Sequence, residues 1–216
     1  IGKTSLYAKD CGFDVTKAVT DNEKYYTLTE EELKLLLDDG SINEECFKIF
    51  CDMDSVASQL KILCNEDIPV LFKPMAVTDN KAYWWETDEE TYKTLWKMMQ
   101  IRFEELHELS NLIWICPATK GRMYPGDDYV DIIGCDIFNN SDNANLQGML
   151  NTDALTLNTK MTALTECFFT PDPDILYRDN CMWLWSGAQG GKYLINPDGY
   201  MTGDYISVSQ MKKIYN

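Results

Sequence analysis

Histidine is almost absent from this sequence, and basic residues are scarce. The 216 residues include one histidine, His107, and 19 lysines and arginines against 35 aspartates and glutamates, a formal net charge of −16. A surface of this sign repels the phosphate backbone, so we expect no nucleic-acid partner. With one histidine and no C-x-x-C pair among the eight cysteines, the usual zinc-ligand sets are missing. We therefore expect neither a metal site nor another cofactor.

Long apolar runs are also missing. No stretch approaches the ~20 apolar residues that a transmembrane helix needs, so we expect no membrane span. There is no low-complexity tract, linker or detectable repeat. Hydrophobic residues make up 45% and charged residues 25% of the chain, which are ordinary globular values. These proportions predict one folded domain over residues 1–216.

Short apolar runs, by contrast, recur along the chain. They are nearly continuous in hydrophobic residues, which is typical of parallel strands buried on both faces of a sheet. Predicted strands cover residues 4–8, 68–72, 111–116, 131–138, 161–168 and 181–185.

Helical patterns alternate with these runs. In one of them, Val56, Leu60 and Leu63 share a helical face. A longer one begins with the sequence TDEE at 87–90, which has the form of a capping box. Predicted helices cover residues 30–40, 52–65, 88–109 and 207–215.

This alternation predicts an α/β fold built from βαβ units around a parallel sheet. A closed (β/α)8 TIM barrel has eight strands and about 250 residues, whereas this chain offers six strands. Either two strands are missing at the front of a barrel or the sheet is open. In both cases the edge strands have unpaired backbone N–H and C=O groups, which proteins usually cover. We therefore expect a protein partner or a further chain segment to complete the barrel.

From residue 68 onward, sequence blocks follow one another in the order and spacing of a known family. The blocks are IPVLFKP (68–74), YWW (83–85), NLIW (111–114), YPGDDYVDIIG (124–134), ALTE (163–166) and WSG (185–187). Together they resemble strands four to eight of glycoside hydrolase family 26, the β-mannanases. The resemblance implies a (β/α)8 TIM-barrel-like fold of which this chain holds strands 3 to 8 only, with the N-terminal part missing or supplied elsewhere.

The resemblance also implies a retaining glycosidase that acts on a polysaccharide, β-mannan or β-glucan, and that is secreted or at the cell surface. Such chemistry uses two carboxyl groups about 5–5.5 Å apart: one attacks the anomeric carbon, and the other protonates the leaving oxygen and later activates water. The block at 163–166 places Glu166 at the nucleophile position. Trp185 falls on the sugar-platform tryptophan after strand eight, and Trp84, Trp85 and Lys73 are further candidates for substrate binding.

The family's second carboxyl group has no counterpart. Aligned on the lysine and proline at 73–74, the family's His-Glu pair falls on Ala76 and Val77, and valine cannot donate a proton. The family's arginine is Lys73 here, which loses the rigid two-pronged donor geometry of a guanidinium. The tyrosine at the end of strand six falls on Phe138.

Two interpretations of function stay open. In the first, the chain is a catalytically impaired glycan-binding or structural module, because general acid–base help typically contributes 10²–10⁴-fold. In the second, it is an active retaining endo-β-mannanase or β-glucanase with Glu166 as nucleophile and a non-standard acid/base. The nearest replacement acids are Asp79 and Glu86, with Asp10 as another candidate.

Other conspicuous residues are expected to have structural roles. Trp96 and Trp114 look like core side chains, and His107 lies in the last turns of a helix, far from the predicted active face. Cys116, Cys135 and Cys181 fall inside predicted strands, where thiols behave as small hydrophobes.

Overall fold

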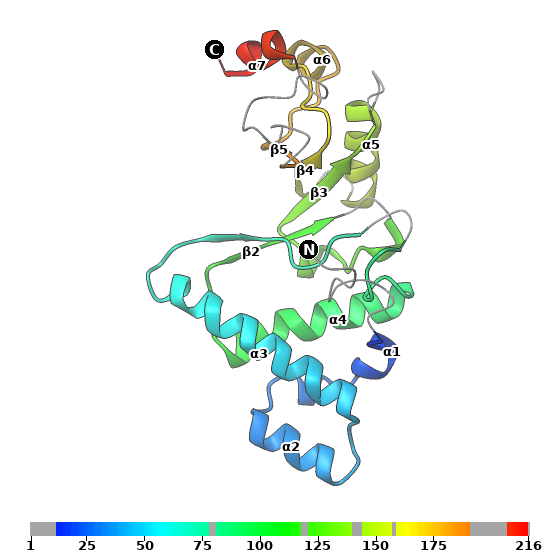
Figure 1. The fold of residues 1–216 in the computed structure, drawn as a ribbon, viewed down its shortest axis with the longest axis vertical. Coiled ribbons are helices and arrows are strands. Elements are labelled where there is room, and N and C mark those ends of the chain that lie inside the picture. Colours follow the sequence, from blue (N-terminus) through cyan, green and yellow to red (C-terminus); the bar gives the residue numbers. More distant parts are fainter. Residues whose placement is uncertain are drawn as a thin grey trace. The chain divides into compact units, whose positions relative to one another are not determined.

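The computed structural model describes residues 12–77, 81–117, 121–139, 144–156, 159–190 and 207–215 (Figure 1). Its α-helices are α1 (Val15–Ala18), α2 (Glu30–Asp38), α3 (Glu44–Cys64), α4 (Glu89–Ile101), α5 (Ala144–Thr156), α6 (Pro173–Arg178) and α7 (Val208–Tyr215). Its strands are β1 (Val70–Phe72), β2 (Leu112–Pro117), β3 (Ile132–Ile137), β4 (Met161–Cys167) and β5 (Ser186–Ala188). The predicted strand at 4–8 lies outside the described residues.

The five strands form one open sheet in the order β1-β2-β3-β4-β5. Every neighbouring pair is parallel, with registers such as Leu71 opposite Ile113 and Gly134 opposite Ala163. Helices α4 and α5 each connect consecutive strands. The α/β class and the parallel sheet are therefore confirmed.

The contacts divide the chain into two compact units, which we describe separately. Unit 1 comprises Ile1–Trp114 and Arg122–Val130, and unit 2 comprises Ile115–Gly121 and Asp131–Asn216. Strand β2 contributes residues to both. A single domain over residues 1–216 stays a prediction.

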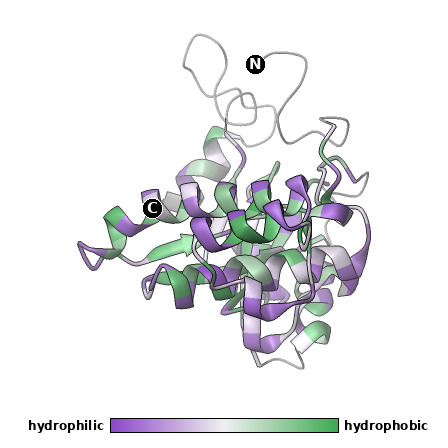
Figure 2. Cartoon of the chain, turned by 90° about the horizontal axis from the view of Figure 1, so that it is seen from below, coloured by the Kyte–Doolittle hydropathy of each residue, from purple (hydrophilic) through white to green (hydrophobic). Residues whose placement is uncertain are grey.

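In unit 1, α3 and α4 start where polar caps precede apolar faces. Asn43 caps α3 by accepting a hydrogen bond from the Cys46 N–H at 2.8 Å, and Asp88 caps α4 by accepting from the Thr91 N–H at 2.9 Å. The predicted start of α4 is confirmed. Figure 2 shows hydrophobic and hydrophilic residues side by side on the helices.

The prediction for α3 was wrong in two respects. The helix starts at Glu44 instead of residue 52, and its buried residues are Cys46, Ile49, Phe50, Met53 and Ala57. Val56 and Leu63, which were expected on the buried face, are exposed. The missed first turns carry the apolar positions that fix the true face at i, i+3, i+4 and i+7 spacing.

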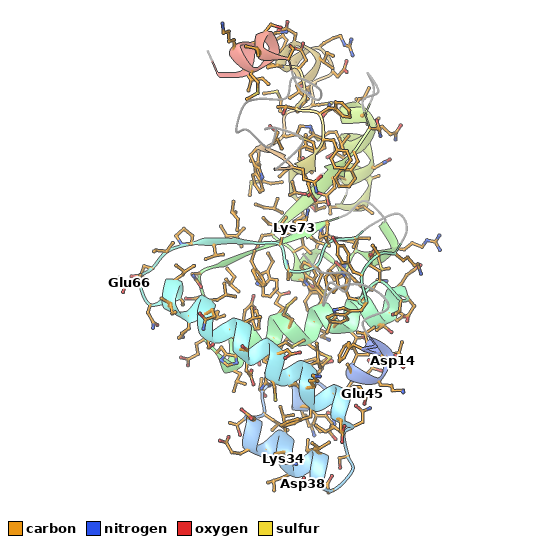
Figure 3. The ribbon with its side chains drawn as sticks, viewed as in Figure 1. Asp14, Lys34, Asp38, Glu45, Glu66 and Lys73 are labelled. Carbon is orange, nitrogen blue, oxygen red and sulfur yellow. The ribbon has the colours of Figure 1, made fainter. Side chains whose placement is uncertain are left out.

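A partly buried ionic cluster joins α3 to the end of α4. The Arg102 guanidinium donates to both carboxylate oxygens of Asp54, at 2.5 and 2.6 Å, and to the backbone oxygens of Tyr26 and Leu28. Nε2 of His107 lies 2.6 Å from the same carboxylate. The structural role predicted for His107 is confirmed. On the outer side of unit 1, Lys34 and Asp38 form an exposed ion pair along α2 (Figure 3).

In unit 2, one face of the sheet packs against α5. A cluster of Cys135, Ile137, Leu164 and Cys167 lies on this face, with partly buried Ala144 of α5 beside it. The predicted strand at 181–185 was wrong: β5 begins at Ser186, because Leu164 and Cys167 of β4 pair with Ser186 and Ala188. The apolar run before it supplies packing instead, with Cys181 fully buried.

Candidate functional site

Strand β4 carries Glu166 inside a β-bulge. Against β3, the four residues 164–167 of β4 stand opposite only three residues, 135–137. Against β5, the same four residues stand opposite the three residues of Ser186–Ala188. The extra residue is therefore present against both neighbouring strands, and bulges of this kind re-aim side chains at functional sites.

The faces of β4 follow from its packing. Leu164 and Cys167 belong to the same buried cluster, although an odd separation places two residues of a regular strand on opposite faces. Side chains of successive strand residues point to opposite faces, so Glu166 faces away from the side of Cys167. By the same rule Thr165 faces away from the side of Leu164. Glu166 and Thr165 therefore lie on the same face. Glu166 is half-buried there.

A second carboxyl group lies next to Glu166 in the sheet. Asp136 is the register partner of Glu166 on β3, and neighbouring strands are about 4.8 Å apart. Its side chain is buried, and its Oδ1 accepts a hydrogen bond from the Thr165 hydroxyl at 2.5 Å. Asp136 was not predicted, although a lone aspartate in an otherwise apolar strand is a signal that could have identified it.

The two carboxylates contribute to a raised pKa of the neighbouring Cys167 thiol. Burial, and to a smaller extent the negative charges of Glu166 and Asp136, together raise the pKa of this thiol to about 11. Cys167 is thus a neutral core thiol and not a nucleophile.

Aromatic side chains follow the ends of the two central strands. Phe138 and Phe168 come directly after β3 and β4, and their ring centroids are 4.6 Å apart. Phe138, which was predicted to stand at the position of the family's tyrosine, is 40% exposed. Trp185 is half-buried just before β5, and its backbone oxygen accepts from the Leu164 N–H.

In unit 1, the segment after β1 is packed by apolar side chains. Lys73 directly follows the strand (Figure 3) and is half-buried. Met75 and Val77 are buried. The Tyr92 hydroxyl donates to the Met75 carbonyl at 3.2 Å, and the Trp85 Nε1–H donates to the Ala76 carbonyl at 2.7 Å. These bonds fix the backbone at the predicted acid/base position.

Trp84 and Trp85 belong to a row of aromatic rings in the same unit. Tyr83 stacks on Trp85 at 4.6 Å, Trp85 meets Trp84 edge-on at 5.0 Å, and Trp84 meets Phe13 edge-on at 4.9 Å. Trp85 is buried, whereas Trp84 is half-buried and keeps surface that a ligand can contact.

Among the alternative acids, Glu86 is fully buried and accepts a hydrogen bond from the Tyr83 N–H at 3.1 Å. Asp79 and Asp10 lie outside the described residues. Trp96 and Trp114 are buried, as predicted, and they donate to the Tyr129 carbonyl and the Glu104 carboxylate.

The predicted site residues thus fall into two groups. Lys73, Trp84 and Trp85 belong to unit 1, and Glu166 and Trp185 belong to unit 2. Within the described ranges, no cluster of three or more His, Cys, Asp or Glu side chains is arranged to hold a metal ion. No helix in that part of the chain is long and apolar enough to cross a membrane.

A parallel sheet whose five described strands lie in sequential order and alternate with helices, with a glutamate near the carboxyl end of β4, is typical of the TIM-barrel class of protein. The chain belongs to glycosyl hydrolase family 26, whose pattern matches residues 11–216.

The relatives of the chain carry mannanase names. A mannan endo-1,4-beta-mannosidase of Thermothelomyces thermophilus is 28% identical over 203 residues, which is 90% of this chain and 37% of that protein. Mannan endo-1,4-beta-mannosidase A of Piromyces sp is 25% identical over 215 residues, which is 100% of this chain and 31% of that protein. The chain therefore spans about a third of the length of these curated relatives.

Solved structures agree on the fold. The Podospora anserina GH26-CBM35 β-(1,4)-mannanase superposes with a TM-score of 0.73 at 27% identity, over 88% of this chain and 40% of that chain. A β-mannanase from a symbiotic protist of the termite Reticulitermes speratus, solved with gluco-manno-oligosaccharide, gives 0.72 at 23% identity, over 99% of this chain and 61% of that chain. The described sheet is therefore part of a family 26 TIM barrel, and the predicted family and partial barrel are confirmed.

Proposed function

We propose that this chain is a glycan-binding domain for β-mannan or β-glucan whose capacity for hydrolysis is strongly reduced. Family membership and the mannanase names of the relatives support the substrate class. The predicted alignment, in which Val77 takes the place of the acid/base glutamate, supports the loss of hydrolysis. In this proposal the protein is secreted or at the cell surface, and a further chain segment or a protein partner completes the barrel.

The observation that carries the proposal is the packing around Val77. This side chain is only 3% exposed, and its neighbours' carbonyl groups accept hydrogen bonds from Tyr92 and Trp85. A segment held in this way presents an aliphatic group where the family's proton donor is expected. The side chain at this position is therefore a packing element that supplies no proton.

Glu166 keeps a limited chemistry in this proposal. A carboxylate oxygen attacks the anomeric carbon while the bond to the leaving oxygen breaks, and that oxygen departs with the electron pair. A sugar leaving group needs a proton at this moment, whereas a nitrophenolate does not. Glu166 therefore reacts with activated glycosides and leaves polysaccharide bound but uncut.

Sugar binding is assigned to the predicted aromatic residues. Trp185 and the half-buried Trp84 offer ring faces that suit the C–H faces of pyranoses. Lys73 supplies a single ammonium donor in place of the family's arginine. Trp85 contributes mainly by supporting Trp84, since it is buried and its N–H is bonded to Ala76.

The second candidate function is an active retaining endo-β-mannanase or β-glucanase. The retained Glu166 and the endo-mannosidase names of the relatives favour it. Its acid/base would be Asp79, two residues beyond Val77, since Glu86 is fully buried and already accepts a backbone hydrogen bond.

One incubation separates the two candidates. The chain is mixed with β-mannan and with mixed-linkage glucan, and both released reducing ends and tryptophan fluorescence are measured. A fluorescence change without products supports the binding domain. Products that disappear in Glu166→Ala establish the enzyme, and Asp79→Asn then tests its acid. No change in either signal rejects both.

A further inference from the structure

We infer that the β4 bulge is the device that turns Glu166 onto the ligand face, and that Thr165 and Asp136 are positioning residues that hold it there. This inference rests on the proposed function, in which Glu166 meets the sugar. It assigns a role to a buried carboxyl group and a hydroxyl to which the proposed function gives none.

The bulge decides which way Glu166 points. In a regular strand with Leu164 and Thr162 facing α5, residue 166 would face α5 as well. The orientation of Thr162 is fixed by its hydroxyl, which lies 3.3 Å from the Met149 sulfur of α5. Inserting one residue reverses the alternation, so that Cys167 enters the buried cluster and Glu166 is turned to the opposite face. Without the bulge, a carboxylate would be driven into the core.

A short hydrogen bond locks the inserted residue. The Thr165 hydroxyl donates to Oδ1 of Asp136 at 2.5 Å, and the Cys135 carbonyl is a more distant acceptor at 3.3 Å. Bonds from a hydroxyl to an ionised carboxylate are shorter and stronger than neutral ones. Because Asp136 is also the register partner of Glu166, this bond ties the bulge to the strand beside it at the level of Glu166.

Two glycines leave the room that the bulge occupies. A Cβ on Gly134 of β3 would lie 2.7 Å from the Thr165 hydroxyl oxygen, and a Cβ on Gly187 of β5 would lie 2.7 Å from the Thr165 carbonyl oxygen. Any side chain at either position would push Thr165 away. Both neighbouring strands are thus shaped around the residue that precedes Glu166.

A probe that needs no proton donor tests this inference in the full chain. We use 2,4-dinitrophenyl 2-deoxy-2-fluoro-β-mannobioside. Glu166 forms a bond to its anomeric carbon while the bond to the aryl oxygen breaks, and dinitrophenolate leaves with the electron pair. Intact mass gives the rate of covalent labelling, and the dependence on probe concentration separates the limiting rate from the apparent affinity. Circular dichroism checks that each variant is folded.

The matched variants are Thr165→Val, which keeps the shape and removes the hydroxyl, Thr165→Ser, which keeps the hydroxyl, and Asp136→Asn. A displacement near 1 Å at a reacting group costs up to about 10²-fold in rate. We therefore expect the limiting rate to fall at least about 10-fold in Thr165→Val and Asp136→Asn, with apparent affinity changed by less than about 3-fold and most of the rate kept in Thr165→Ser.

Wild-type rates in both Thr165→Val and Asp136→Asn overturn the inference, and so does a folded wild-type chain that is never labelled. If Thr165→Val fails to fold, Asp136→Asn and Thr165→Ser decide alone. Failure of the proposed function has a different signature, since it appears as no fluorescence response of the wild-type chain to mannan oligosaccharide.

Discussion

We predict that the segment after β1 and the bulge of β4 carry the two carboxyl positions of the family, and the two regions are built in opposite ways. In the segment after β1, Met75 and Val77 are buried, and Trp85 and Tyr92 donate hydrogen bonds to the backbone carbonyls of Ala76 and Met75. Opposite Glu166 lies the buried Asp136 carboxylate, which accepts from the Thr165 hydroxyl, and Gly134 and Gly187 leave room for Thr165. Burying a polar group costs free energy of folding unless the group is hydrogen-bonded. The bulge carries this cost, whereas the apolar segment after β1 does not.

Introducing a carboxyl group into the apolar segment should have the largest effect. Val77→Glu buries a carboxyl group without a partner, and we expect a loss of about 3 kcal/mol in the free energy of unfolding at neutral pH. Burial raises the pKa of such a group, so its neutral form is favoured and the loss should shrink as the pH falls toward 4.

Urea unfolding at pH 4.5 and 7.5 measures this loss. Val56→Glu, on the exposed side of α3, is the control and should change stability by less than about 0.5 kcal/mol. Equal losses for the two variants would show that the segment around Val77 tolerates an acid. The contrast between this segment and the β4 bulge would then be wrong.

A methyl group at the bulge should have the next largest effect. Gly187→Ala forces a Cβ to 2.7 Å from the Thr165 carbonyl oxygen, and we expect about 2 kcal/mol of destabilisation. Gly190→Ala is the matched control, because nothing lies within 4 Å of its Cβ. Thermal unfolding of both variants checks the prediction, and a Gly187→Ala chain as stable as Gly190→Ala would mean that the strands relax around Thr165.

The hydrogen bond from Trp85 to the Ala76 carbonyl should contribute less to stability. Trp85→Phe removes the Nε1–H donor, which leaves the Ala76 carbonyl without this bond, and we expect about 1 kcal/mol of lost stability. Tryptophan fluorescence of the same variant should show whether mannan binding survives. Unchanged binding would show that the hydrogen bond of Trp85 serves packing and is not required for the contact between Trp84 and the sugar.

The smallest expected effect at neutral pH is that of Cys167, which changes the stability of unit 2 only at alkaline pH. The pKa of Cys167 is raised from its ordinary value of 9.0 to about 11, so the folded state favours the neutral thiol. Its contribution to stability is fully present below pH 9 and is lost as the pH rises through about 11. Cys167→Ala should flatten the decline of stability over this window in urea titrations, and an unchanged slope would contradict this assignment.

The sequence predicted the strands well where apolar runs were uninterrupted. Strands β2, β3 and β4 lie within one or two residues of their predicted bounds, because strands buried on both faces leave a continuous hydrophobic signal. β5 was misplaced, since its three small residues, Ser186, Gly187 and Ala188, carry no such signal. Helices α5 and α6 were not predicted.

The bulge could not be predicted from periodicity. Whether residue 165 or 166 is the inserted one depends on register against two other strands, which a single stretch of sequence does not contain. Glu166 could be located by resemblance to the family, but its partner Asp136 and the glycines around Thr165 needed the paired strands.

The central claim is that proton supply to the leaving group is what this chain lacks. The most direct measurement is the rate of Glu166 glycosylation across a series of aryl mannobiosides whose phenols span a wide range of pKa values. The account predicts a rate that falls steeply as the pKa of the leaving phenol rises, with no detectable cleavage of mannan. A rate that is nearly independent of the leaving group, together with cleavage of mannan, would show that a proton donor is present and would contradict it.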